Sequence, residues 1–504
     1  MKKHLLTLLL ACSVACGLTP QQVMVVYNAD SKLSKETALK YASLRSIPAE
    51  NLVPLKGITK APITRTRFVL DIEQRLVAEA ESKGWMLPSS SAFEPRKKHI
   101  LALVLMPDFP IRILEDNFDP RKKKNDQLKN TASLDSELTL LGARYPIDGA
   151  LHNPFYTKDA SLPQAQPRVL AVTRIDAPSP EAIRRMIQGP VKVEKQGLWG
   201  WTVVDQGGPH TAGDKWFSAA ANHAKTAKQA LFYETSQKTL SKAFPLMPQT
   251  SVYIGWYTGH PDGPFHLKTP GGFRFPPGAI ACHLYSYSAS PSVRHTSSWC
   301  GTLLERGAAV TAGNVTEPYL GHCLNYDVFY DRLLKGYTVA EAGLMASPSL
   351  SWQGAIYGDP LYRPYGALKK GTHTVDNPFA VWRNILQKSH GNAAQILRVV
   401  QQRLTKPDGA IYAEMFAWHC LENNMQQGAS TYFALACRAS RTHADKLRNR
   451  LMQISTMFSF GDKDAAKALM RATLQENTTS PHAPAVEALA DVVIKEERPA
   501  PNKK

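Results

Sequence analysis

Several side chains capable of nucleophilic, basic or acidic chemistry fall within one stretch of the sequence, between residues 251 and 365. They end or follow short apolar runs and are His260, Cys282, His283, Ser286 and Glu317. A thiol or hydroxyl becomes a nucleophile when a base lies within hydrogen-bond reach. The ends of adjacent parallel strands can place one such residue each at that distance. If the protein is an enzyme, the stretch therefore predicts a hydrolytic site at these strand ends.

The strand pattern restricts the role of each candidate. Cys282 and His283 are adjacent, and side chains alternate along a strand, so these two point to opposite faces and do not form a pair. We therefore predict His260 as the base, Cys282 or Ser286 as the nucleophile, and His283 as a residue that lines the pocket. The alternative is that Cys282 is a core cysteine, since cysteine is among the most buried residue types.

Two carboxylates follow predicted strands in the same stretch. Glu317 and Asp359 are each followed by proline, and either could orient the base, although such sequences also form turns. A metal site built from histidine and aspartate is a further alternative. Its ligands would be His260, His283, His322 and Asp359, but no two of them have the short spacing typical of zinc ligands. No metal and no cofactor is therefore predicted.

Other polar residues end predicted strands or begin predicted helices. Ligands bind at the carboxyl ends of strands in open α/β sheets, so these residues are predicted to bind substrate. They are Asp135, Glu137, Arg174, Asp176, Asp205, Tyr257 and Asp359. For Asp135 and Glu137 an alternative remains, because acidic residues in the first turn of a helix also stabilise the helix dipole.

The elements that position these residues alternate between strand and helix. Apolar runs such as QVMVVY, HILALVLM and SVYIGW, separated by amphipathic segments, predict an α/β fold with a doubly wound, mostly parallel sheet. Beyond Asn377 the composition changes to alanine, leucine, methionine and glutamine with helical periodicity, which predicts an all-α, repeat-like region. The predicted units are residues 1–18 (signal peptide), 19–165 (N-terminal α/β), 166–370 (second α/β) and 378–495 (helical).

The N-terminal sequence MKKHLLTLLLACSVACGL has a cationic start and a short apolar run, which is typical of a signal peptide. Export to the periplasm, outer membrane or exterior is expected, with plain secretion and a lipid anchor at Cys12 or Cys16 both open. The five later cysteines could form disulfides, pairing Cys420 with Cys437 and Cys300 with Cys323, or could all be reduced and buried.

The net charge of +18 in 504 residues is carried partly by two basic runs, residues 96–99 and 121–124. No stacking aromatic residues or nucleic-acid module accompany these runs, so a solvated basic surface is the expectation and a nucleic-acid partner is not predicted. The expected partner is an unknown protein or envelope component, and membrane contact is limited to the N-terminal anchor.

Parts of the sequence resemble gingipain-type cysteine peptidases of the caspase-like class. The resemblance lies in residues 256–260 (WYTGH), 307–313 (GAAVTAG), 357–361 (YGDPL) and 173–178 (TRIDAP), and in a strand that carries a cysteine. It implies a caspase-like fold in which a histidine ends one strand and the catalytic cysteine ends the next. The chain departs from this pattern, since Pro261 replaces the glycine after the histidine and Cys282 sits early in its strand without a following glycine.

A closer resemblance is to an uncharacterised family of exported bacterial proteins, over about residues 23–365. It rests on four sequence boxes, which are residues 135–138 (DSEL), 283–289 (HLYSYSA), 313–320 (GNVTEPYL) and 358–364 (GDPLYRP). This resemblance implies a shared fold but no reaction. The two functions it leaves open are a hydrolase with a degenerate peptidase-like site and a non-catalytic binding or assembly protein that uses its helical region.

Overall fold

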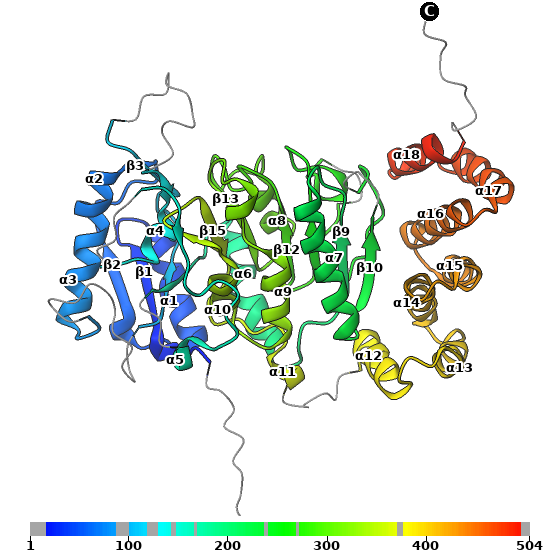
Figure 1. Ribbon diagram of the computed structural model, residues 1–504, viewed down its shortest axis with the longest axis horizontal. Coiled ribbons are helices and arrows are strands. Elements are labelled where there is room, and N and C mark those ends of the chain that lie inside the picture. The colour runs from blue at the N-terminus through cyan, green and yellow to red at the C-terminus, as the bar shows by residue number, and fades with distance from the viewer. Residues whose placement is uncertain are drawn as a thin grey trace, which may run out of the picture.

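A computed structural model gives the fold (Figure 1). It describes residues 17–86, 100–117, 130–142, 148–165, 169–235, 240–268, 272–369 and 376–494. Mostly parallel sheets with flanking helices form the first part of the chain, and a curved array of helices forms the last part. The predicted fold class is therefore confirmed. Residues 1–16 of the predicted signal peptide, both basic runs and the C-terminal residues 495–504 lie outside the described residues.

The first sheet has six strands in the order β13-β15-β8-β4-β1-β2. Their bounds are β1 Val23–Asn28, β2 Leu52–Leu55, β4 Ala102–Leu105, β8 Ala171–Arg174, β13 Thr311–Asn314 and β15 Gly354–Tyr357. β1 pairs in parallel with β2 and β4, and β4 with β8, whereas β13 and β15 are antiparallel. Alternate residues of β1 enter two different core clusters, so both faces of this sheet are covered.

Four further strands form a fully parallel sheet in the order β10-β9-β11-β12. They are β9 Trp201–Asp205, β10 Ala230–Glu234, β11 Thr250–Gly255 and β12 Ile280–His283. The Ala281 amide donates to the Val310 carbonyl (2.9 Å), and Ile280 forms a parallel bridge with Val310, so β12 runs beside β13 and joins the two sheets. The division predicted at residues 165/166 does not separate the sheets, because β8 pairs with β4.

Helices connect these strands and cover the faces of the sheets. Those in the α/β region are α1 Lys32–Arg45, α2 Arg65–Phe68, α3 Gln74–Ser82, α4 Leu134–Leu138, α5 Leu162–Ala165, α6 Pro180–Glu194, α7 Thr211–Thr226, α8 Trp299–Glu305, α9 Tyr326–Leu334, α10 Val339–Ala346 and α11 Gly366–Lys369. Small strands complete two minor sheets, β3 Ile63–Thr64 with β5 Arg112–Leu114 and β6 Ala132–Ser133, and β7 Leu151–His152 with β14 Ser349–Leu350. Side-chain caps such as Ser31 for α1 and Ser179 for α6 fix where these helices begin.

The last part of the chain is an array of helices that we call the helical tail. It consists of α12 Pro378–Lys388, α13 Ala393–Arg403, α14 Gly409–Glu422, α15 Gln426–Ala439, α16 His443–Ser459, α17 Lys463–Glu476 and α18 Ala483–Val493. The tail packs beside β10, the edge strand of the sheet (Figure 1). The rings of Phe232 and Trp418 lie 4.4 Å apart there, and Arg448 joins Glu414 (2.7 Å) to the Pro245 carbonyl (3.2 Å). The tail therefore covers an otherwise open sheet edge.

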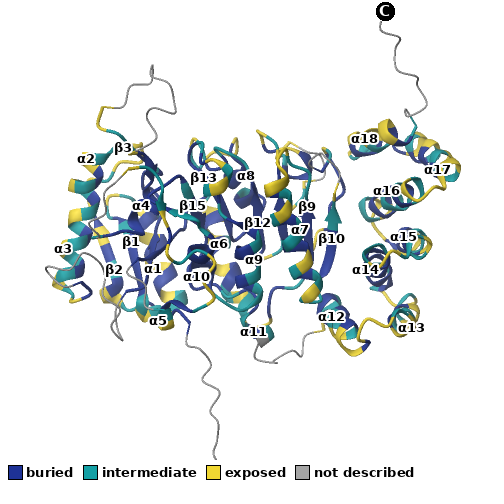
Figure 2. Cartoon of the chain, viewed as in Figure 1, coloured by how far each residue is buried: buried dark blue, intermediate teal, exposed yellow. Residues whose placement is uncertain are grey.

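Buried residues concentrate along the strands, whereas each tail helix has both buried and exposed faces (Figure 2). Cys282, Cys300, Cys323, Cys420 and Cys437 are all free and buried, which matches the reduced alternative and not the paired one. Among the residues described, no helix combines the length and apolar character needed to cross a bilayer.

Candidate functional site

Three strand ends meet at one level of the parallel sheet. Gly255 of β11 lies opposite Asp205 of β9 on one side and opposite His283 of β12 on the other. A Cβ atom at Gly255 would lie 2.1 Å from the hydroxyl oxygen of Tyr253. The absence of a side chain at Gly255 therefore lets the Tyr253 hydroxyl lie between the aspartate and the histidine.

A hydrogen-bonded chain runs through these buried groups. The Tyr253 hydroxyl donates to Asp205 Oδ2 (2.9 Å) and lies 3.2 Å from His283 Nδ1. The Thr258 amide donates to His283 Nε2 (3.3 Å). Because the one hydroxyl proton of Tyr253 points to Asp205, the remaining contact requires His283 Nδ1 to carry its proton and donate to the tyrosine oxygen. Every proton in the chain then points from Thr258 towards Asp205.

Burial controls the protonation of this chain, since Asp205, Tyr253 and His283 are all almost fully buried. It raises the pKa of Asp205 well above its usual value, and the nearby Glu234 carboxylate raises it further. Burial also lowers the pKa of His283 well below the usual value, so the imidazole is neutral. His283 is 1 % exposed, so it acts on the loop above it and does not meet a ligand directly.

Two stacked rings, those of His283 and Trp299, hold the loop after β11 in place. His283 and Trp299 stack with ring centroids 3.6 Å apart. His283 accepts the Thr258 amide, and Trp299 Nε1 donates to the Thr258 carbonyl (2.9 Å). Trp256 also points inward, because its Nε1 donates to Asp214 Oδ1 (3.1 Å). With residues 256 and 258 held inside, Tyr257 is directed to solvent.

An aromatic surface lies above this support. Tyr257 and Tyr319 are 42 % and 48 % exposed, which is unusual for such large side chains. The rings of Tyr257 and Tyr285 lie 4.8 Å apart. Burial raises the pKa of Tyr257, as do the neighbouring Tyr285 and the Glu317 carboxylate, so Glu317 lies near this ring. We call Tyr257, Tyr285, Glu317 and Tyr319 the carboxyl-edge surface.

The predicted thiol mechanism is not supported by this geometry. Cys282 is 1 % exposed and packs in the apolar cluster on the face of β12 opposite His283. Burial raises the pKa of its thiol far above the usual value, and the nearby Cys300 raises it further. Within the described part of the chain, Cys282 and His260 share no hydrogen bond. The thiolate that a nucleophile requires is therefore unavailable, and the assignment of Cys282 as nucleophile is corrected.

The other predicted catalytic residues are more accessible. His260 is exposed in the loop after β11, and Ser286 is partly exposed in the turn after β12, next to Tyr285. A Cβ atom at Gly259 would lie 2.9 Å from the Tyr285 hydroxyl, so the two loops touch beside His260. Glu317 belongs to the same surface. The structure thus brings together the loops predicted to form a site, without a hydrogen bond between His260 and Ser286 among the described residues.

Several residues predicted to bind substrate form buried internal contacts. Arg174 Nη2 pairs with Asp135 Oδ2 (2.7 Å) and also donates to the Pro110 carbonyl (2.9 Å). Glu137 pairs with Arg65 (2.6 Å) and accepts from the Ser351 hydroxyl (2.6 Å). These side chains are occupied by internal partners. The expectation that Arg174 and Glu137 bind substrate is corrected accordingly.

Asp176 and Asp359 are also held by cations. Asp176 is 1 % exposed and pairs with Arg294 (2.9 Å). Asp359 accepts from the Tyr41 hydroxyl (2.8 Å) and pairs with Arg45, the last residue of α1. Since β15 is antiparallel to β13, its end at Asp359 lies at the opposite edge of the sheet from Asn314. Asp359 is therefore remote from the carboxyl-edge surface and does not orient His260.

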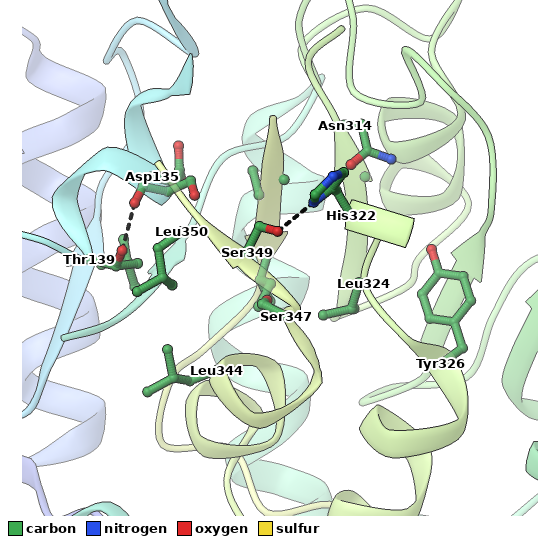
Figure 3. Close-up of a pocket in the computed structure, with 16 residues that line it drawn as sticks. Asp135, Thr139, Asn314, His322, Leu324, Tyr326, Leu344, Ser347, Ser349 and Leu350 are labelled. Atoms are coloured by element: carbon green, nitrogen blue, oxygen red, sulfur yellow. Dashed lines mark hydrogen bonds between the residues drawn. The ribbon is translucent and has the colours of Figure 1, made fainter. Parts of the chain in front are cut away.

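A small cavity lined by polar and apolar side chains lies between β13, β15 and the segment around β14 (Figure 3). Its volume is about 50 Å³, and the residues that line it include Asp135, Ser136, Asn314, His322, Ser347 and Ser349. The Ser349 hydroxyl oxygen lies 2.6 Å from His322 Nδ1, and Figure 3 marks this contact with a dashed line. The first and third sequence boxes both contribute to this cavity. The sequence predicted no role for Ser349, because it lies 27 residues from His322 with no motif around it.

In the part of the chain that the structure describes, no group of three or more histidine, cysteine, aspartate or glutamate side chains is arranged to hold a metal ion. Comparison with protein-family models, with curated proteins and with solved structures finds no match, so the family resemblance remains a prediction.

Proposed function

We propose that this chain is an exported binding protein whose ligand occupies the carboxyl-edge surface. One observation carries the proposal: an exposed tyrosine, Tyr257, projects from a loop whose neighbouring residues are fixed by Trp299, His283 and Asp214. A rigid aromatic side chain offers a large contact area at a low entropic cost. Export follows from the signal-like N-terminal sequence.

The chemistry of the surface favours a cationic ligand. Among the described residues, no arginine, lysine or histidine forms an ion pair with Glu317, which accepts only the Tyr319 amide (3.1 Å). A guanidinium or ammonium group is attracted both to a carboxylate and to the face of a tyrosine ring. The partner we propose is a peptide segment that presents an arginine or lysine side chain. The net charge of +18 gives no long-range attraction for such a ligand, so recognition depends on these short-range contacts.

A hydrolase built from His260 and Cys282 has less support, because the thiol is buried in the apolar core. Binding through the helical tail also has less support, because helices α12 and α14 pack against β10. By contrast, the side chains of Tyr257 and Tyr319 in the carboxyl-edge surface are exposed.

The test measures binding of a capped glycine peptide that contains one arginine, by isothermal titration, with the citrulline analogue as the neutral match. An exposed cation–π contact contributes about 0.5–1 kcal/mol, so Tyr257→Ala should weaken binding about two- to fivefold. Glu317→Gln should weaken it by a similar factor, since an exposed ion pair contributes about 0.2–1 kcal/mol. The citrulline peptide should bind more weakly than the arginine peptide.

Two control variants match these changes at remote exposed positions. Glu36→Gln removes one negative charge from α1, and Phe460→Ala removes an aromatic ring that is 52 % exposed at the end of α16. Both should leave binding unchanged. Equal binding of the arginine and citrulline peptides, or equal effects of the control and test variants, would overturn the proposal.

A further inference from the structure

The cavity beside β14 contains a serine and a histidine in the arrangement of a nucleophile and its base. Ser349 Oγ lies 2.6 Å from His322 Nδ1, within the range of a good hydrogen bond. Both side chains line the cavity and both are partly exposed, so a small molecule can reach them. This pair uses none of the side chains of the carboxyl-edge surface, although the two adjoin, since the His322 amide donates to the Tyr319 carbonyl (3.0 Å).

The fold fixes both members of the pair. Ser349 begins β14 and lies opposite His152 of β7. The buried Asn153 side chain donates to the carbonyls of Leu344 and Ser347 (2.7 Å each), which fixes the chain leading to Ser349. His322 ends the short 3-10 helix Leu320–His322. The serine is therefore held by a strand pair and the histidine by a helical turn.

The environment of the histidine suits a base. Burial lowers the pKa of His322, so the imidazole is neutral at pH 7 and Nδ1 can accept the Ser349 proton. The Asn314 side chain lines the same cavity, and its amide nitrogen makes long contacts, 3.5 Å to the Tyr285 carbonyl and 3.7 Å to Cys323 Sγ. Its amide is a donor available to a developing oxyanion.

We propose that Ser349 and His322 form a nucleophile–base dyad that hydrolyses esters of small acyl groups. The cavity of about 50 Å³ sets the size of the acyl group, since one water needs roughly 10–15 Å³ measured in this way. An acetyl group fits this space, and a long acyl chain does not. The ligand class is thus a short-chain ester.

The reaction balances without a cofactor. Ser349 Oγ adds to the ester carbonyl while its proton moves to His322 Nδ1. Collapse of the intermediate breaks the bond to the leaving oxygen, which takes the proton from His322 and departs as the alcohol. Water then gives a proton to His322 and adds to the acyl-serine carbonyl. Ser349 leaves, recovers its proton, and the carboxylic acid is released.

The test uses the whole chain and a fluorophosphonate probe, which forms a bond from phosphorus to Ser349 Oγ as fluoride leaves with the proton. We expect mass spectrometry of the wild-type digest to locate the label on Ser349, and p-nitrophenyl acetate to be cleaved faster than p-nitrophenyl octanoate. A general base contributes about 10²–10⁴-fold, so His322→Gln should slow labelling at least about 100-fold. Ser349→Ala should abolish it.

Ser82→Ala is the matched control, because the exposed Ser82 lies in α3 outside the cavity lining and its hydroxyl donates to the Glu79 carbonyl (2.8 Å). In this variant, Ser349 should be labelled at the wild-type rate. The labelling rate should also fall only when the pH drops below the usual pKa range of an imidazole, because His322 must be neutral to act as a base. A purely structural role of His322 would not produce this pH dependence. Absence of label on Ser349 in the folded wild-type protein overturns the proposal, as does a labelling rate that His322→Gln leaves unchanged.

Discussion

Replacing Tyr253 by phenylalanine tests the buried chain beneath the carboxyl-edge surface. The change removes the hydroxyl that donates to Asp205 (2.9 Å) and accepts from His283 (3.2 Å), and both partners stay buried. Leaving a buried polar group without its partner costs about 1–3 kcal/mol, so two such groups give about 2–6 kcal/mol. With an unfolding entropy of about 2.1 cal/mol/K per residue over roughly 350 residues, Tm should fall by about 3–8 °C.

A second measurement locates the effect. The Thr258 amide donates to His283, so loosening the imidazole should speed amide hydrogen exchange in residues 256–260 by about tenfold. The matched control is Tyr330→Phe, since Tyr330 is also buried and its hydroxyl bonds a neutral group, the Thr202 hydroxyl (2.9 Å). It should lower Tm by about 1–2 °C and leave exchange in residues 256–260 unchanged. Equal effects of the two variants on both readouts would refute the proposed support of the loop.

Three further predictions concern buried groups. Because burial raises the pKa of the Cys282 thiol, iodoacetamide should not modify it in the folded protein at pH 8, and rapid modification seen by mass spectrometry would contradict its placement in the core. Asp135→Asn leaves the buried Arg174 charge uncompensated and should lower the free energy of unfolding by about 3–5 kcal/mol. The control Glu181→Gln breaks an exposed pair and should lower it by less than about 1 kcal/mol. Similar losses for the two variants in denaturant melts would contradict the stabilising role of the buried pair. Burial raises the pKa of Glu422 to about 7, although nearby lysines oppose the shift. The folded state therefore holds this proton more tightly than the unfolded state, so Tm should fall as the pH rises from 5 to 8. Glu422→Gln should reduce that fall, and a pH profile of Tm that the variant leaves unchanged would refute the assignment.

The sequence was sufficient for the main elements of the fold. The apolar runs at residues 23–28 and 250–255 are strands β1 and β11, because uninterrupted apolar segments of that length suit strands buried on both faces. The change in composition after Asn377 marks the start of the helical tail. The joining of the sheets through β12 and β13 could not be predicted, because it depends on pairing between residues 30 positions apart, Ile280 and Val310.

The sequence predicted which strand ends carry the loops of the candidate site better than it predicted the surroundings of each side chain. Strand alternation correctly separated Cys282 from His283, and the burial of Cys282 then excludes it as a nucleophile. The support of His283 by Tyr253 was not predictable, since it requires the missing side chain of Gly255 two residues later. Single carboxylates also look alike in sequence. Only the structure separates Glu317, which lacks a cation in the described residues, from Asp359, which is paired with Arg45.

The most direct test of the central claim is a hydrogen-exchange footprint of the arginine peptide on the whole chain. We predict slower exchange in residues 256–260, 285–288 and 315–320, which contain the four residues of the carboxyl-edge surface, and no change in the tail helices α13, α15 and α17. Protection confined to those tail helices, with none at residues 256–260, would contradict this prediction.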